Sequence, residues 1–541
     1  MYIGDYLARR EVYSPDRLAI IDTGKNPAWR LTYREMNERA NRFANWLRGE
    51  AGIEKRDRVA ILARDGVEHL DCFFGCSKIG AIHTALNWRL HWRELAQIVE
   101  TTTPSVLIYS DDFREGVEQL QAETRGTDHE IRRYLHVEGS GVSGSLHFES
   151  IISQSPNAPV RNESVDKEDV AALIFTGGTT GFPKAAEVSH RMIAWNTLNT
   201  VIHDITHHDV YLNVFPMFHT GGLFVYTLPQ VVFGGTTILV RQFDPELVLE
   251  LMEREGVTVF AGVPTMYQMM TQAENWDEAD LTSLRFCTSG GAPLPVPLVK
   301  KYTEEKGIRF KQGFGMTEFG PGIFALAPED AIRKAGSIGR PNFYVDARVV
   351  DDENKPLDPN EVGELTLKGP SMCSGYFGAP EATATMLDED GWFHTGDLAQ
   401  YDEEWYFFIV GRKKDMFISG GENVYPPEIE AALYEHPSVH MCAVIGIPDP
   451  TWGEVGVACV VLEPEGQATE EELLAFLRDR LAGYKVPKRV VFMDELPISG
   501  AGKVLKRELK EAVTQNSAGG MEDGKRKTSD SSARYNVKGK A

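Results

Sequence analysis

Short apolar runs rich in β-branched residues recur along the chain, and this pattern constrains the fold most strongly. They occupy residues 59–62, 170–175, 257–263 and 284–288, and the last three each end in or next to Gly, Pro or Thr. Continuous apolar strands are typical of sheets that helices cover on both faces. Because helical patterns separate these strands, the sequence predicts an α/β fold. In such folds ligands bind outside the carboxyl ends of the strands, so we look there for chemistry.

Two helical patterns illustrate the alternation. Thr32 and Glu35 have the spacing of a capping box, and an apolar stripe with helical periodicity follows them as far as Gly49. A second helical pattern runs through Cys72 and ends near Ile79. These helices flank the strand predicted at residues 59–62.

The length of 541 residues is too great for one hydrophobic core, so we expect at least two domains. From Gly420 onward a smaller α+β unit is predicted, with a helix that begins at Pro427. Strands near 441–447 and 457–462 and a helix near 470–481 complete it. The last residues, 517–541, are rich in Gly, Ser, Lys and Asp, and we expect a disordered tail there.

The composition excludes several classes of protein. A formal charge of −23 argues against a general nucleic-acid binder, because such binding depends on clustered Lys and Arg. Neither a signal peptide nor a run of about 18 apolar residues is present, so we expect no membrane span, while peripheral attachment stays open. The six scattered cysteines form no CxxC pair and fit buried thiols in a reducing cytoplasm.

The segment at 175–184 reads FTGGTTGFPK and directly follows a predicted strand. Its glycines permit close approach, so backbone N–H groups and threonine hydroxyls can surround phosphate oxygens while Lys184 supplies positive charge. The spacing is not that of a Walker loop. Taken alone, the segment is equally compatible with an ordinary glycine-rich loop.

Further motifs follow in a fixed order: SGGAPLP from Ser289, GFGMTE from Gly313, TGD from Thr395, GRKKDMFISGGENVYPPEIE from Gly411 and GAGKVLKREL from Gly500. Together with the segment at 175–184, here called the phosphate loop, this series resembles the motifs of the adenylate-forming superfamily. That superfamily comprises acyl-CoA synthetases, peptide-synthetase adenylation domains and firefly luciferase. The resemblance covers nearly the whole chain except the tail and is nearest to the fatty-acid or aryl-acid CoA ligases.

The resemblance implies a large N-terminal domain, residues 1–410, built from stacked α/β sheets and a small β-barrel-like subdomain. A hinge at 411–414 then leads to a small mobile α+β C-terminal domain at 415–516. Lys414 is the implied hinge residue.

The resemblance also implies the catalytic and nucleotide-binding residues. Lys503 is the implied catalytic lysine, whose ammonium would stabilise the charge that develops as a carboxylate attacks the α-phosphorus of ATP. Glu318 and Thr176 would hold Mg²⁺, because an oxygen-rich site suits that ion. The implied ATP- and AMP-binding residues are Thr176, Gly177, Gly178, Thr179, Thr180, Gly181, Lys184, Gly290, Gly291, Ala292, Pro293, Gly313, Phe314, Gly315, Met316, Thr317, Asp397, Ile409 and Arg412.

The acid and the thiol are expected to bind at two other segments. PMFHTGG, from Pro216, offers no aspartate to pair with the ammonium of an amino acid, so the acid is expected to be of another kind. His219 is an implied catalytic or gating residue, and the predicted acyl pocket consists of Phe218, His219, Leu223, Tyr226 and Phe314. The predicted CoA-binding residues are Ser419, Gly420, Gly421 and Glu422.

Three positions depart from the family pattern. Gly177 replaces a hydroxyl residue, Ala185 a glycine and Ala501 a serine. None of these changes removes a charged catalytic group, so we expect altered rates rather than an inactive enzyme.

The predicted reaction joins an acid to CoA in two steps, through an acyl-AMP, at the expense of MgATP. A medium- or long-chain fatty acid is favoured, with an aryl acid as the alternative. Delivery of the acyl group to a carrier protein and a non-catalytic nucleotide binder are further alternatives. A monomer and a homodimer are equally compatible with the sequence.

Overall fold

The computed structural model describes the chain except for residues 1–3, 177–182, 293, 465, 499–503 and 520–541. The chain forms two compact units. Unit 1 comprises residues 1–347 and 367–393, and unit 2 comprises residues 348–366 and 394–541. The predicted domain boundary at 410 and the hinge at 411–414 stay predictions, and the predicted tail falls mostly on residues outside those described.

Unit 1 contains a nine-stranded sheet whose central strands are parallel. The edge strands β15, β16 and β2 run antiparallel to their neighbours. The spatial order is β16 (Arg340–Pro341), β15 (Gly320–Leu326), β14 (Phe310–Met316), β13 (Phe286–Gly290), β12 (Val259–Gly262), β10 (Val210–Asn213), β11 (Thr236–Leu239), β1 (Leu18–Asp22) and β2 (Trp29–Thr32).

A second, seven-stranded sheet in unit 1 is parallel except for its last strand, β9, which pairs antiparallel with β8. Its order is β7 (Leu146–His147), β6 (Arg133–His136), β5 (Val106–Tyr109), β3 (Arg58–Leu62), β4 (Ile82–Ala85), β8 (Val170–Thr176) and β9 (Lys184–Ser189).

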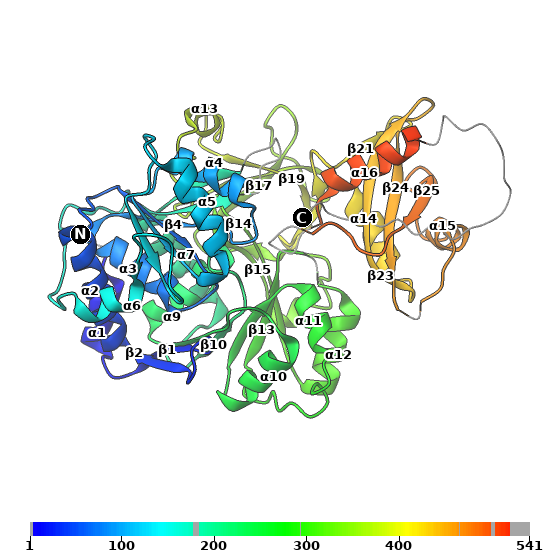
Figure 1. The fold of residues 1–541 in the computed structure, drawn as a ribbon. Coiled ribbons are helices and arrows are strands. Elements are labelled where there is room, and N and C mark those ends of the chain that lie inside the picture. The colour runs from blue at the N-terminus through cyan, green and yellow to red at the C-terminus, as the bar shows by residue number, and fades with distance from the viewer. Residues whose placement is uncertain (1–3, 177–182, 293, 465, 499–503, 520–541) are drawn as a thin grey trace. The chain divides into compact units, whose positions relative to one another are not determined.

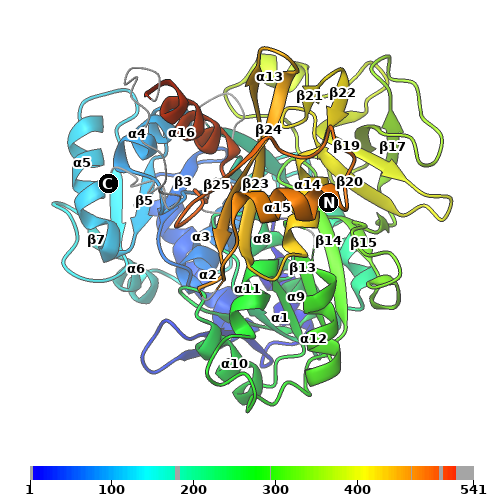
Figure 2. The same ribbon diagram turned by 90° about the vertical axis from the view of Figure 1, so that its right-hand side faces the viewer.

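Helices pack on these sheets and enclose several apolar cores. One core joins α10, α11 and α12 to strands of the nine-stranded sheet, and Figure 1 shows these helices together beside β13. On the seven-stranded sheet α2, α3 and α6 share one core and α4 and α5 another; Figure 2 shows α4 and α5 beside β5. The helices of unit 1 are α1 (Tyr6–Tyr13), α2 (Tyr33–Gly49), α3 (Val67–Ile79), α4 (Trp92–Thr102), α5 (Arg114–Thr124), α6 (Phe148–Gln154), α7 (His190–Asn199), α8 (Thr220–Phe224), α9 (Thr227–Phe233), α10 (Pro245–Arg254), α11 (Pro264–Met270), α12 (Val296–Lys306) and α13 (Pro380–Ala384), with 3₁₀ turns η1 (Asp111–Phe113), η2 (Thr200–His203) and η3 (Pro328–Asp330).

Unit 2 holds most of a four-stranded sheet and a separate five-stranded sheet. Helices α14 and α15 share a core with the five-stranded sheet, and residues of α16 belong to a second core on it. The elements are β17 (Asp346–Val350), β18 (Gly363–Lys368), β19 (Phe393–Tyr401) and β20 (Phe407–Arg412), then β22 (Glu422–Val424), β21 (Phe417–Ser419), β24 (Gly453–Leu462), β23 (Val439–Asp449) and β25 (Arg489–Phe492), with α14 (Pro426–Tyr434), α15 (Glu470–Arg478) and α16 (Lys506–Gly519).

The predicted α/β fold class is confirmed, and most predicted elements lie within a few residues of their observed bounds. Thr32 and Glu35 form the expected capping box, with each side chain bonded to the other's backbone N–H. Two strands begin two residues later than the apolar runs suggest. The reason is local: Val257 N bonds to the end of α10 and Leu284 N closes a turn, so neither is available to a neighbouring strand.

Two findings concern burial. All six cysteines are buried and unpaired, which confirms the prediction of buried thiols. Among the described residues, no helix has both the length and the apolarity needed to cross a bilayer.

Helix α3 is buried along its whole length, charged residues included. Lys78 Nζ lies 2.7 Å from Asp5 Oδ1, and Arg39 pairs with Asp71 at 2.7 Å. Because an unpaired buried charge is expensive, each charge on this helix needs its partner from a neighbouring segment. Ion pairs thus allow the charged residues of this helix to occupy the core of unit 1.

We expect Lys78→Ala to lower the free energy of unfolding by about 3 kcal/mol, because it leaves the Asp5 carboxylate buried without its cation. Urea denaturation of the variant and the parent measures the effect. Lys301→Ala is the control, since Lys301 forms a more exposed pair with Glu305 at 3.7 Å, and it should cost less than about 1 kcal/mol. Equal losses in both variants would contradict this account of α3.

Candidate active site

Residues 373–377, here called the bridging segment, connect the two sheets of unit 1. The segment runs beside β9, where its backbone bonds to Ala185 and Glu187 with N–O distances of 2.9 to 3.0 Å. At its other end Cys373 N donates to Glu318 O at 2.7 Å, in the turn between β14 and β15. These backbone bonds hold the turn that carries Glu318 near the strand that carries Lys184.

The side chain of Tyr376, in the bridging segment, lies between these two charged residues. Its hydroxyl donates to Glu318 Oε1 at 3.0 Å, and Lys184 Nζ lies 5.1 Å from its ring centroid. Burial and the neighbouring Glu318 carboxylate both raise the pKa of Tyr376, so the phenol keeps its proton and remains a donor. The structure therefore gathers a cation, a phenol and a carboxylate.

The predicted phosphate loop joins two adjacent strand ends. Thr176 ends β8, Lys184 begins β9, and the two residues are cross-strand partners. Thr176 Oγ1 donates to Lys184 O at 3.4 Å. The predicted ligands Gly177, Gly178, Thr179, Thr180 and Gly181 lie outside the described residues.

Glu318 has the chemistry that a Mg²⁺ ligand requires. Its Oε1 accepts from Tyr376, whereas Oε2 accepts no hydrogen bond from any described residue. Over the described ranges no three His, Cys, Asp or Glu side chains gather into a metal-binding group. A magnesium ion here would take one carboxylate from the protein and further oxygens from phosphates and water, as is usual for nucleotide-bound Mg²⁺.

The predicted nucleotide-binding residues of the SGGAPLP and GFGMTE motifs lie at the carboxyl ends of two parallel strands. Gly290 of β13 pairs with Gly313 of β14, and Gly291 takes a positive φ of 82°. Gly315 lies so close to the next strand that a Cβ would be 2.4 Å from Pro321 O. The small residues therefore allow the strand ends to approach one another. Ala292 and Met316 belong to the same two segments, and Thr317 is buried. Pro293 lies outside the described residues.

The PMFHTGG segment forms a tight turn that leads into α8. Asp65 Oδ1 accepts from Met217 N at 2.8 Å and anchors the turn. The Phe218 ring is buried, with its centroid 6.1 Å from that of Trp88. His219 Nδ1 accepts from Gly221 N at 3.2 Å, so in the neutral imidazole the proton is on Nε2.

The remaining predicted acyl-pocket residues differ in exposure. Leu223 is buried in α8, and Tyr226 is buried with its hydroxyl 2.8 Å from Thr288 Oγ1 and 3.0 Å from His203 Nδ1. Phe314 remains partly exposed and contacts Phe324 edge to face. Phe314 and the half-buried His219 are thus the more accessible members of the predicted pocket.

Asn196, on α7, fastens α8 to β15. Its Nδ2 donates to Phe224 O at 2.7 Å, and its Oδ1 accepts from Gly322 N at 3.1 Å. Both polar atoms of the buried amide are therefore used. Asn196 therefore links the end of α8, which carries the predicted acyl-pocket residue Leu223, to β15.

In unit 2, Asp397 and Arg412 are cross-strand partners in β19 and β20, with Nε 2.9 Å from Oδ1. The Asp397 carboxylate is buried, whereas Arg412 is exposed. Ile409 lies on the same strand as Arg412, and the exposed Lys414 follows that strand. The predicted catalytic residue Lys503 lies outside the described residues.

The predicted CoA-binding segment is a two-residue hairpin in unit 2. Ser419 pairs with Glu422, and Gly420 and Gly421 form the turn with φ of 63° and 89°. Two positive φ values in succession favour glycine, which explains the local sequence. Figure 2 shows β21 and β22 at one end of the five-stranded sheet.

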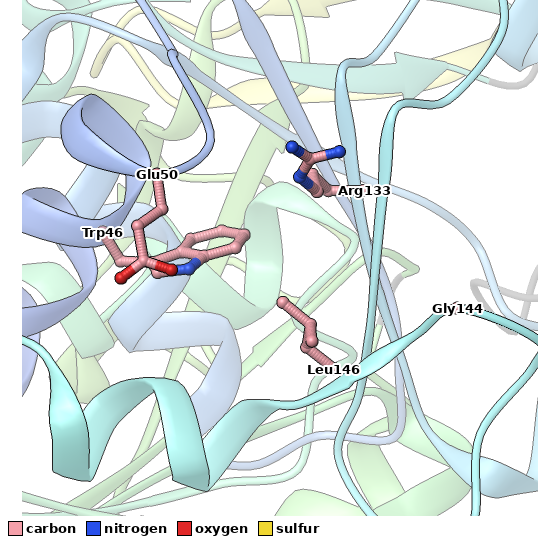
Figure 3. A pocket seen from close by; sticks show the side chains of 5 residues that line it. All are labelled: Trp46, Glu50, Arg133, Gly144 and Leu146. Carbon is pink, nitrogen blue, oxygen red and sulfur yellow. The ribbon is translucent and has the colours of Figure 1, made fainter.

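A pocket of about 320 Å³ lies elsewhere in unit 1. As Figure 3 shows, it is lined by Trp46, Glu50, Arg133, Gly144 and Leu146. None of these five residues belongs to the predicted site.

Two family models match the chain. The model described as AMP-binding enzyme covers residues 7–377, and that of the AMP-binding enzyme C-terminal domain covers residues 428–503. The chain belongs to the AMP-binding enzyme family. This confirms the resemblance to the adenylate-forming superfamily.

Relatives of this AMP-binding enzyme act on different acids, according to their names. A feruloyl-CoA synthase of Amycolatopsis sp is 42% identical over 94% of this chain and 98% of its own. An indoleacetate–CoA ligase of Aromatoleum aromaticum is 35% identical over 95% and 99%. A long-chain-fatty-acid–CoA ligase of Mycobacterium tuberculosis is 35% identical over 94% and 98%.

Solved structures agree with this assignment. ATP-bound MatB from Rhodopseudomonas palustris matches with a TM-score of 0.86 at 32% identity, covering 95% of this chain and 99% of that one. The anthranilate CoA ligase AuaEII in complex with anthranoyl-AMP matches with a TM-score of 0.88 at 26% identity, covering 96% and 98%. The AMP-binding enzyme described here is an AMP-forming acid–CoA ligase, with ATP and CoA as its co-substrates.

Sequence reasoning missed three residues that organise the candidate site. Tyr376 contacts both Lys184 and Glu318, Asp65 anchors the PMFHTGG turn, and Asn196 fastens α8 to β15. Each acts on a segment distant in sequence, and the pattern around each is ordinary. Only Asn196 gave a weak signal, as a polar side chain within the mostly apolar stretch MIAWNTL.

We expect Asp65→Asn to flatten the dependence of stability on pH. Burial raises the pKa of Asp65 to about 7, partly offset by the Met217 N–H. The folded protein therefore keeps a proton that the unfolded chain has already released, and stability falls as the pH rises from about 4 to 7. Between pH 5 and 7 this amounts to about 2 kcal/mol.

Urea denaturation of the parent and the variant at pH 5, 6, 7 and 8 measures this slope. The introduced asparagine side chain retains an acceptor for Met217 N but does not titrate in this range. Asp112→Asn is the control, because Asp112 is exposed and pairs with Arg64 at 3.1 Å. Parallel curves for the parent and Asp65→Asn would show that Asp65 does not hold a proton at neutral pH.

Proposed function

We propose that the acid is an aromatic carboxylic acid, activated in unit 1 as acyl-AMP and then transferred to CoA. The observation that carries this proposal is the Asn196 contact. Its hydrogen bonds to Phe224 O and Gly322 N link α8 to β15 next to the predicted acyl-pocket residues. We infer that this contact limits the depth of the acyl pocket, and a short pocket suits a ring, whereas a long alkyl chain needs a deep channel.

The residues near the Asn196 contact also favour a flat group. Gly315 and Gly322 expose backbone, while the ring of Phe314 remains partly accessible beside them. Rings prefer edge-to-face or offset contacts with other aromatic side chains. The names of the feruloyl and indoleacetate relatives support an aromatic acid, and that of the mycobacterial relative supports a fatty acid.

We assign the first step to residues gathered by the bridging segment. Lys184 and the predicted phosphate loop would hold the phosphates of ATP, and Glu318, oriented by the Tyr376 hydroxyl, would hold Mg²⁺. The ion would neutralise charge on the phosphates. An oxygen of the acid attacks the α-phosphorus, pyrophosphate leaves, and acyl-AMP forms. During this attack, the N–H on His219 Nε2 would orient the acid.

We assign a share of the chemistry to unit 2. Lys503 would stabilise the charge of the first transition state, and Asp397 and Arg412 would hold the ribose and phosphate of the nucleotide. In the second step the CoA sulfur attacks the acyl carbonyl and AMP leaves, with the arm of CoA passing along the hairpin of Gly420 and Gly421. Lys414 would serve as the hinge between the two steps.

An acid panel tests the choice of substrate. We expect cinnamate-type and indole-type acids to give pyrophosphate release and a CoA thioester. Their kcat/KM should be at least about tenfold above that for C8 to C16 fatty acids, which corresponds to about 1.4 kcal/mol in transition-state binding. Pyrophosphate release and thioester formation are measured separately, with and without CoA. Preferential turnover of fatty acids would refute the aromatic assignment and leave the ligase activity intact.

We expect Lys503→Ala to abolish formation of acyl-AMP while thioester formation from supplied acyl-AMP stays within about threefold of the parent, because the ammonium is needed only when charge develops at phosphorus. The two half-reactions are followed separately with purified acyl-AMP. Lys488→Ala, a change to another lysine of unit 2, is the control and should spare acyl-AMP formation. Equal loss of both half-reactions in the Lys503 variant would argue against a step-specific role.

A further inference from the structure

Three buried asparagines meet over Gly322 of β15. Asn196 and Asn199 lie on α7, and Asn342 directly follows β16. A Cβ built on Gly322 would lie 3.2 Å from Asn196 Oδ1, 3.6 Å from Asn342 Nδ2 and 3.8 Å from Asn199 Cβ. Each of the three side chains is at most 3% exposed, whereas Gly322 itself is partly exposed. Accessible space therefore borders a group of buried amides.

The three amides differ in how their hydrogen-bonding capacity is used. Asn196 uses both polar atoms within the protein. Asn199 Oδ1 accepts from Tyr344 N at 3.2 Å, but its Nδ2 has no partner among the described residues. Neither Nδ2 nor Oδ1 of Asn342 has one there either. A buried polar group without a partner costs about 1–3 kcal/mol, so such groups call for a reason.

The cluster lies on the same side of the sheet as a predicted acyl-pocket residue. Gly322 and Phe324 are two residues apart on β15 and share a face. Phe324 is the cross-strand partner of Phe314 and contacts its ring at a centroid distance of 5.8 Å. Asn196, from the same cluster, bonds to the backbone of α8. The unpaired amides thus border the region assigned to the acid.

The unpaired atoms match one functional group closely. The two Nδ2 groups are donors, and Asn342 Oδ1 is an acceptor. A hydroxyl has one O–H donor and two acceptor lone pairs, so it can bond to all three atoms. A methyl or methylene group would leave them unpaired. A carboxylate would offer no donor to Oδ1 and, among these amides, would find no cation.

We propose that Asn199 and Asn342 bind a hydroxyl group on the ring of the acid and thereby select hydroxylated aromatic acids. This inference rests on the proposed function, since it assumes an aromatic acid between α8 and β15. It adds a polar recognition element to a pocket that is otherwise aromatic and backbone-lined. Both asparagines act on substrate binding and orientation, not on the reacting carboxylate.

The test compares matched acids with the parent and with Asn342→Leu. The probes are cinnamate and its 2-, 3- and 4-hydroxy derivatives. In the parent, at least one hydroxycinnamate should exceed cinnamate in kcat/KM by about tenfold or more, chiefly through a lower KM. Asn342→Leu should abolish this preference by raising KM for the hydroxylated acid while leaving cinnamate within about twofold.

Two further variants separate recognition from stability. Asn342→Ala removes the amide without adding bulk and should show the same loss of preference if the leucine variant folds poorly. Asn41→Leu changes another buried asparagine, on α2, whose Oδ1 has no partner in the described part of the chain, and should leave the preference unchanged. The thermal midpoint of Asn342→Leu should equal or exceed that of the parent, because an unpaired amide has been removed.

The outcomes distinguish the two proposals. A parent enzyme that converts cinnamate and the three hydroxycinnamates equally well would overturn the hydroxyl site and leave the aromatic assignment standing. A preference that survives in both Asn342 variants would overturn it as well. Turnover of fatty acids alone, with none of the cinnamates accepted, would overturn the aromatic assignment and this inference together.

Discussion

The short backbone contact made by the bridging segment is the constraint on which the candidate site of unit 1 depends. Lys184 belongs to one sheet and Glu318 to the turn at the edge of another, and neither sheet alone fixes their separation. Residues 373–377 bond to both. Because backbone hydrogen bonds leave little freedom along a strand, the strand that carries Lys184 and the turn that carries Glu318 are held close together. The Tyr376 hydroxyl, 3.0 Å from Glu318 Oε1, adds a side-chain link to the carboxylate.

The sequence predicted the local features of the fold well. The capping box at Thr32 and Glu35 and the strand that begins at Val170 follow from interactions within a few residues of each other, and the structure contains both. Where strand starts were misplaced, a competing local bond had taken the N–H group, as at Val257. Such competition depends on where the preceding helix ends, which an apolar run does not reveal.

The candidate site was predicted less completely because it is assembled from distant segments. Thr176 and Lys184 were found through their motif, and their pairing follows from the β8–β9 hairpin. Tyr376 and Asp65 were not, since each lies more than 50 residues from the group it supports. Their roles depend on which sheet edges meet, and this information is carried by the tertiary structure.

In the proposed pocket, the choice of acid would depend on both polar and apolar contacts. The aromatic residues predicted for the pocket are not equivalent. The Tyr226 hydroxyl is hydrogen-bonded to Thr288 and His203, whereas the Phe314 ring is partly exposed. In the proposed pocket, the hydrogen bonds of Asn196 would limit its depth, and the neighbouring amides would give it polarity. Shape and hydrogen-bonding capacity would thus be supplied by different residues of one small region.

The complete burial of α3 has an evolutionary consequence. A charge on this helix is tolerated only with its partner, so Lys78 with Asp5, and Asp71 with Arg39, can be replaced safely only as pairs. Among descendants of this enzyme such positions should covary, with apolar residues entering both members of a pair. Diversification of the acid specificity is then left to segments such as α7 and β16, where a single replacement leaves no buried ion behind.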